Sequence, residues 1–173
     1  MKKLTLLALI VIATCTAVIA QPRAIGGRIG WNIGASYQHQ IGEKNMIQAD
    51  LDLLGYWYGG QATVTYNWII PIKSWEIGTF NAFAGVGVGG GFRWGYRSFF
   101  IPWRYGYWGS KYGFVGVAGN GGVEFNFKFG LQLSAEWRPL IGPRFYKGGG
   151  VGYYLDGLYV SALALGVRYR FGK

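Results

Sequence analysis

Apolar and polar residues alternate along the last stretch of the chain, Tyr159–Phe171. Its odd positions from Leu163 to Phe171 carry large apolar side chains, whereas its even positions from Ala162 to Arg170 are small or charged. A repeat of two residues is the period of a β-strand, whose successive side chains point to opposite faces. The stretch is therefore predicted to be a strand with one apolar face and one polar face.

The same alternation recurs through most of the chain after residue 20. Six further stretches carry it: Ala24–His39, Ile47–Trp57, Gln61–Ile70, Trp75–Gly91, Tyr112–Phe127 and Leu131–Pro139. Segments rich in glycine, proline or polar residues predict short turns at 42–45, 58–60, 71–74 and 128–130. Two longer segments, 92–111 and 141–157, are predicted to be loops. Seven strands are clear from this pattern.

The composition is unusual for a protein with a water-facing surface. The chain has 31 glycines and is 18 % aromatic but only 14 % charged. Such a chain hides its apolar face in a core, as in a soluble β-sandwich, or presents it to lipid. In lipid every backbone polar group needs a partner, so a sheet must close on itself. We predict an all-β fold, a closed antiparallel up-and-down transmembrane β-barrel of about 8 strands.

An even strand number requires one more strand than the pattern resolves, because bacterial single-chain barrels have even numbers of strands. Either Ala24–His39 contains two short strands with a turn near Gly30–Asn32, or one of the loops contains the eighth strand.

Residues 1–20 are predicted to be a signal peptide. Lys2 and Lys3 precede an apolar run, Leu4–Ala13, and the small-residue pattern Ala17–Ala20 marks a cleavage site. Residues 21–173 then form the barrel domain. The chain's only cysteine, Cys15, lies in the predicted signal peptide, and without Lys2 and Lys3 the remaining 15 basic and 7 acidic residues give a net charge of +8.

Loop lengths predict the orientation. Outer-membrane barrels have short periplasmic turns and longer external loops, and their last strand ends in the periplasm. Counting back from that strand places 42–45, 71–75 and 128–130 at the periplasmic end and 58–60, 92–111 and 140–157 outside. Aromatic residues on the apolar face suit the two membrane interfaces. These residues are Trp31, Tyr37, Trp57, Tyr66, Trp68, Trp137, Tyr169 and Phe171.

The polar face is predicted to line the barrel interior and to carry both signs of charge. An eight-stranded barrel is just wide enough for side chains to fill it. Charges packed there are expected to pair, which closes the interior to solutes. The alternative is a narrow, porin-like conduit that opens when an ion pair exchanges partners. The candidate residues are Arg28, Asp50, Asp52, Glu124, Glu136, Arg138, Arg168 and Arg170.

The predicted external loops interleave basic and aromatic residues. This pattern suits anionic lipopolysaccharide headgroups at the outer surface. It also suits single-stranded nucleic acid, but the predicted export signal argues against such a partner. The alternative is a solvated rim among anionic lipids. The candidate residues are Arg93, Trp94, Arg97, Trp103, Arg104, Trp108, Lys111, Arg144 and Lys147.

Candidate chemistry is sparse. His39 is the only histidine, and Ser36 and Glu43 lie close to it in sequence, which raises the alternative of a lipid A acyl hydrolase. Ser36 and His39, three residues apart on one strand, point to opposite faces, and a hydrogen bond between them is not expected. One histidine and no cysteine after residue 20 predict no metal site. We expect neither a cofactor nor an enzymatic activity.

Several segments together resemble the small outer-membrane β-barrel proteins of Bacteroidota. They are Ala24–Gly30, Gly34–His39, Gly42–Asn45, Phe83–Gly87, Gly122–Phe125, Leu133–Pro139 and Val167–Phe171. The resemblance implies a place in the bacterial outer membrane, among its lipids and lipopolysaccharide. The closing aromatic strand looks like the signal that the barrel-assembly machinery recognises during insertion, although Gly172 and Lys173 follow it. The family shares no common reaction.

The expected function is therefore that of a monomeric barrel with a structural or surface-interaction role. A narrow pore or a lateral route for a hydrophobic molecule is the first alternative, and the acyl hydrolase is the second.

Overall fold

The computed structural model describes residues 22–54, 59–94, 111–156 and 162–172. The predicted signal peptide lies outside these residues. The described residues form ten strands, joined in one antiparallel sheet. They are β1 (Arg23–Gly30), β2 (Ile33–Ile41), β3 (Asn45–Leu54), β4 (Gly59–Trp75), β5 (Gly78–Arg93), β6 (Tyr112–Phe127), β7 (Leu131–Trp137), β8 (Leu140–Tyr146), β9 (Val151–Asp156) and β10 (Leu163–Phe171). No described residue belongs to a helix long and apolar enough to cross a membrane.

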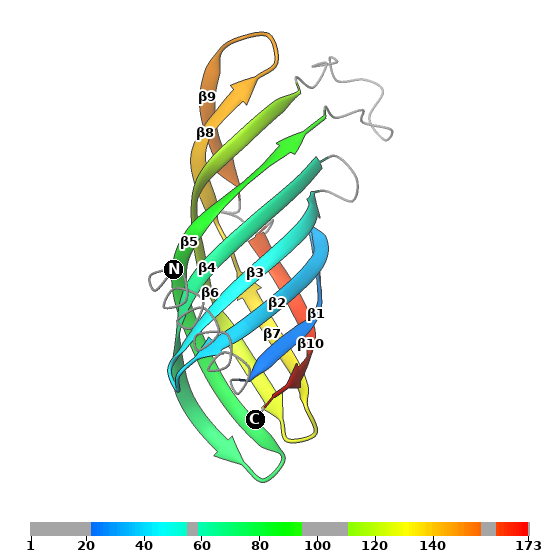
Figure 1. The fold of residues 1–173 in the computed structure, drawn as a ribbon, viewed down its shortest axis with the longest axis vertical. Helices are drawn as coiled ribbons and strands as arrows, with labels where there is room; N and C mark the ends of the chain where they lie inside the picture. The colour runs from blue at the N-terminus through cyan, green and yellow to red at the C-terminus, as the bar shows by residue number, and fades with distance from the viewer. Residues whose placement is uncertain (1–21, 55–58, 95–110, 157–161, 173) are drawn as a thin grey trace, which may run out of the picture.

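The sheet closes into a barrel. Strands β1 to β6 pair in sequence order, β6 pairs with β7, β7 with β10, and β10 with β1. These eight strands form a continuous ring, which confirms the predicted closed antiparallel barrel of eight strands (Figure 1). Closure joins the first and last strands in register, with Ile25 opposite Tyr169 and Ile29 opposite Leu165.

The eighth strand comes from the N-terminal stretch, as the first of the two alternatives predicted. Ala24–His39 divides into β1 and β2, which pair as a hairpin with Ile29 opposite Ile33. Trp31, at the tip between them, is 62 % exposed.

The predicted loop at 141–157 is wrong. Strands β8 and β9 form a hairpin there, and β8 continues the line of β7 along β6 after a break at Arg138 and Pro139. Gly149 and Gly150 make the turn, with φ values of 81° and 113° that favour glycine. The hairpin rises beyond the rest of the barrel at the end that we call the loop end (Figure 1).

The turn predicted at 71–74 is also displaced, and Gly59 and Gly60 of the turn predicted at 58–60 belong to a strand. Strand β4 continues through Pro71 to Trp75, because a register shift between Pro71 and Lys73 forms a bulge where the missing proline N–H is tolerated. The turn then follows at residues 76–77. Gly59 and Gly60 pair with Arg93 and Phe92 inside the sheet, and residues 55–58 lie outside the described residues.

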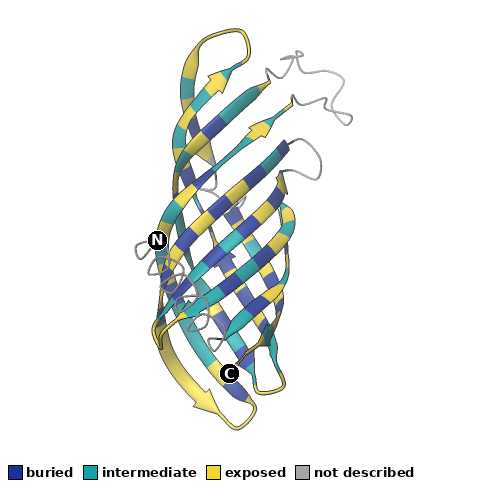
Figure 2. Cartoon of the chain, in the orientation of Figure 1, coloured by how far each residue is buried: buried dark blue, intermediate teal, exposed yellow. Residues whose placement is uncertain are grey.

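The other two predicted turns, at 42–45 and 128–130, join neighbouring strands. Together with the β4–β5 hairpin they define the turn end of the barrel, opposite the loop end (Figure 1). Buried and exposed positions alternate along the strands of the ring (Figure 2). The inward positions are mostly polar, and the outward positions are aliphatic or aromatic. This distribution is the inverse of a soluble core.

Candidate functional site: the charged barrel interior and the loop-end rim

A single carboxylate, that of Glu136, joins three arginines at the centre of the barrel. Its Oε1 lies 2.5 Å from Nη2 of Arg168. Its Oε2 lies 3.1 Å from Nη2 of Arg138 and 3.2 Å from Nε of Arg28. Glu136 is 1 % exposed, so these charges attract one another in a region of low dielectric where an unpaired ion is very costly.

Two aspartates complete this network. Arg28 Nη1 lies 3.0 Å from Asp52 Oδ2, and Arg138 Nη1 forms an ion pair with Asp50 Oδ2. Neither of these two ion pairs joins neighbouring strands of the sheet. Asp50 and Asp52 project inward from β3, while the arginines come from β1, from the residue after β7 and from β10. Three guanidinium groups and three carboxylates therefore balance. We call these six residues the charge network.

Neutral polar side chains surround the charge network and fix its geometry. Arg168 donates from Nε to Ser36 Oγ and from Nη1 to Ser134 Oγ, each at 2.8 Å. Gln48 donates to Glu136 Oε2 at 3.0 Å and accepts from Gln38 at 3.0 Å. Buried polar groups with such partners lose little on leaving water, and an interconnected set of this kind is rigid.

The remaining two predicted interior charges, Glu124 and Arg170, are not part of the charge network. The Glu124 carboxylate accepts hydrogen bonds from three amides, those of Asn81 at 3.1 Å, Asn126 at 2.7 Å and Gln132 at 2.7 Å. Glu124 and Arg170 both line a polar cavity of about 180 Å³ near the turn end. The structure thus brings together six of the eight candidates and places the other two below them.

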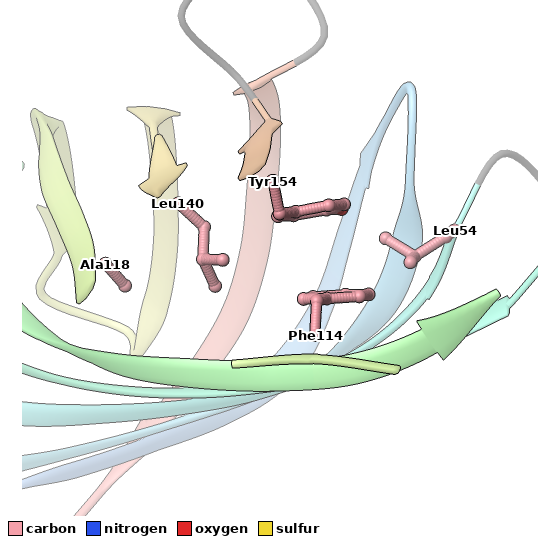
Figure 3. Packing of buried hydrophobic residues seen from close by; sticks show 5 residues of the cluster. All are labelled: Leu54, Phe114, Ala118, Leu140 and Tyr154. Carbon is pink, nitrogen blue, oxygen red and sulfur yellow. The ribbon is translucent and has the colours of Figure 1, made fainter. Parts of the chain in front are cut away.

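Apolar side chains close the interior above the charge network, and sequence reasoning missed them. Leu54, Phe114, Leu140 and Tyr154 point toward one another inside the barrel (Figure 3). The rings of Phe114 and Tyr154 stack, with centroids 3.9 Å apart and planes 9° apart. Phe114 shares its side of β6 with Asn120 and Glu124. Its even position number, which it shares with these inward residues, was therefore the signal in the sequence that an aromatic ring lies inside.

Little space remains around the charge network. A cavity of about 20 Å³ lies between Arg28, Asp52 and Arg138, which leaves room for about one water molecule. The larger polar cavity opens toward the turn end and does not include any member of the charge network. The side chains of the described residues therefore fill most of the interior at its middle.

Five of the predicted rim residues are described, and four are not. Arg93, Trp94, Lys111, Arg144 and Lys147 lie at the loop end, whereas Arg97, Trp103, Arg104 and Trp108 lie outside the described residues. The Arg144 guanidinium stands 5.7 Å from the ring centroid of Tyr112 and 5.2 Å from that of Tyr146. Lys111 and Lys147 line a shallow groove of about 300 Å³ together with Arg93 and Trp94.

The candidate hydrolase residues are separated. Ser36 is 2 % exposed and holds the Arg168 guanidinium in the interior. His39 lies on the opposite face of β2, where its Nδ1 is 3.3 Å from the Tyr37 hydroxyl. Within the described part of the chain, no group of three or more His, Cys, Asp or Glu side chains is placed to hold a metal ion.

Comparison with known proteins adds no assignment: no protein-family model matches this chain, and no curated protein matches it.

Proposed function

We propose that this chain is a β-barrel protein of the bacterial outer membrane, a monomer with a structural or surface-interaction role and an interior closed to solutes. One observation carries the proposal: charged side chains fill the inside of the barrel, while large apolar side chains cover its outside. Leu51, Val88 and Leu165 are 61–66 % exposed, whereas Glu136 and Arg168 are each 1 % exposed. A lipid environment makes this distribution of side chains favourable.

Aromatic residues on the outer face also support a lipid environment. Tyr66, Trp68 and Tyr169 lie toward the turn end, and Trp31 and Trp137 lie toward the loop end, all between 39 % and 62 % exposed. Aliphatic side chains occupy the outer face between these two sets. Two aromatic girdles around an aliphatic band are typical of outer-membrane barrels. Tyr37 and Phe171 extend the turn-end girdle, and Trp57 lies outside the described residues.

The interior favours a plug over a pore. All six members of the charge network are at most 6 % exposed, and the apolar layer of Leu54, Phe114 and Tyr154 lies above them. Opening a conduit would require several buried ion pairs to separate at once. We propose no reaction for this protein, because Ser36 is engaged with Arg168 and His39 lies on the other face.

The sequence resemblance to the small barrels of Bacteroidota supports insertion by the barrel-assembly machinery and contact with lipopolysaccharide at the loop end. In this orientation the turn end faces the periplasm. The basic and aromatic residues of the rim then lie among the headgroups of the outer leaflet.

The test is fractionation of cells, followed by gel electrophoresis of the outer-membrane fraction with and without boiling. A closed barrel stays folded in cold detergent because every strand edge of the ring is paired, so its mobility should change on heating. A soluble periplasmic protein without such a change would contradict the proposal. In planar bilayers, we expect no steady conductance; openings that change with Glu136→Gln would support the pore alternative.

A further inference from the structure

The outer face at the loop end carries a groove between two phenylalanines. Phe92 of β5 lies opposite Gly113 of β6, and Gly113 lies opposite Phe145 of β8. Phe92 and Phe145 are 46 % and 48 % exposed. Because glycine has no side chain, Gly113 leaves a gap between the two phenylalanine rings on the outer face of these three strands. The gap forms the floor of the 300 Å³ groove at the rim.

Packing does not require a glycine at the floor of this groove. A Cβ at Gly113 would meet only the Gly91 carbonyl oxygen, at 3.7 Å, which is ordinary van der Waals contact. Many inward glycines differ in this respect: a Cβ at Gly87, for example, would collide with the backbone of β4. The groove is therefore an open feature of the outer face that a larger side chain at position 113 would fill.

Two lysines stand at the outer end of the groove. The backbone N–H of Lys147 donates to the carbonyl of Lys111 at 3.1 Å, which places the two residues side by side, just after the end of β8 and just before the start of β6. Both side chains are exposed, and both residues line the groove. Lysines in such a place typically lay their stems on apolar surface and keep the ammonium group in water. No acidic residue lines the groove. Moving outward along these strands, the surface changes from aliphatic to aromatic to cationic.

This order matches an amphiphile that has acyl chains below an anionic headgroup. We propose that the groove binds one acyl chain of lipopolysaccharide between Phe92 and Phe145, over Gly113, and that Lys111 and Lys147 bind a phosphate of its glucosamine headgroup. The inference rests on the proposed function, which places the loop end in the outer leaflet. The aromatic pair Phe92 and Trp94, with ring centroids 4.6 Å apart, forms one wall of the site.

The test measures lipid binding to the purified full-length barrel in mild detergent by native mass spectrometry. The probes are lipid A with its phosphates and the same lipid A after dephosphorylation. Gly113→Leu fills the groove and should weaken binding of both probes by at least about tenfold. Lys111→Gln with Lys147→Gln should weaken binding of the phosphorylated probe alone by about 25-fold, since each lysine near an anionic surface contributes about a factor of five.

Matched controls are available on the same barrel. Val117→Leu adds one methylene on the same face of β6, outside the groove, and Lys44→Gln with Lys128→Gln removes two exposed lysines from the turn end. Both controls should bind lipid A as the unaltered protein does. Equal binding by all variants, or equal displacement of lipid A by phosphatidylglycerol, would overturn the inference.

Gel mobility with and without boiling, measured on the same samples, separates this inference from the proposed function. If the mobility shifts on heating but Gly113→Leu binds lipid as the unaltered protein does, the proposed lipid groove is wrong and the proposal of a membrane barrel is not affected. Absence of the shift in the unaltered protein would overturn the proposed function itself.

Discussion

Arg28 on β1 and Glu136 on β7 meet inside the barrel, with the guanidinium Nε 3.2 Å from the carboxylate Oε2, although β10 lies between their strands in the sheet. The contact is made across the curved interior. It depends on closure of the barrel, because closure brings β1, β10 and β7 around one axis. The charge network is therefore a consequence of the tertiary structure and also a part of what stabilises it.

Neutralising the central carboxylate should destabilise the barrel strongly. Glu136→Gln leaves three buried arginines with only Asp50 and Asp52 as anionic partners, and breaking a buried pair in this way costs about 3–5 kcal/mol. Urea unfolding of the barrel in micelles, followed by tryptophan fluorescence, measures the change. Glu43→Gln in an exposed turn is the matched control and should alter the free energy of unfolding by less than about 0.5 kcal/mol. Similar losses in both variants would contradict a special role for Glu136.

Two adjacent residues on β6 should differ in how much stability their truncation costs. Phe114 is 4 % exposed inside the barrel, and Val115 is 51 % exposed on its outer face. Phe114→Ala should cost about 3–5 kcal/mol because it leaves a cavity against Tyr154. Val115→Ala should cost less than about 1 kcal/mol in micelles, since detergent tails contact the shortened side chain as they contacted the longer one. A larger loss for Val115→Ala in the same unfolding assay would mean that the two faces are reversed.

A methyl group at Gly87 should be poorly tolerated. Its Cβ would collide with the carbonyl oxygen of Val64 and lie 2.6 Å from the Cα of Thr65, so β4 and β5 would have to move apart. We expect Gly87→Ala to lower the free energy of unfolding by about 1–3 kcal/mol. Gly27→Ala is the control, because a Cβ there meets only the Gly34 carbonyl oxygen at 3.6 Å. Equal stability of the two variants would show that β4 and β5 lie farther apart at Gly87 than the structure has them.

The position of His39 predicts that lipid A remains unmodified. Ser36 and His39 face opposite sides of β2 and do not form a nucleophile–base pair. Cells that overproduce the protein should therefore have the same lipid A acylation, measured by mass spectrometry, as cells that overproduce His39→Ala or no barrel. Loss of an acyl chain only with the unaltered protein would restore the hydrolase hypothesis.

The sequence concealed the β1–β2 hairpin for a geometric reason. Ile29 pairs with Ile33, so three residues lie between them and odd positions stay on the outer face through the turn. The alternation therefore continues unbroken from one strand into the next. At 141–157, Pro143 and the glycines obscured an alternation in which Ile141 and Phe145 point outward and Leu140 and Tyr146 do not.

The period of two along the chain determined by itself that this protein is built of strands with one polar and one apolar face, because side-chain alternation follows from strand geometry whatever the pairing. Partner choice did not follow from that period. Closure and register brought Arg28, Arg138 and Arg168 to Glu136 and left Glu124 among amides. The groove over Gly113 likewise exists only because Phe92 and Phe145, far apart in sequence, pair with the same residue from either side. Such cross-strand neighbours are set by the stagger of a closed sheet, a property of the whole ring that no single strand encodes.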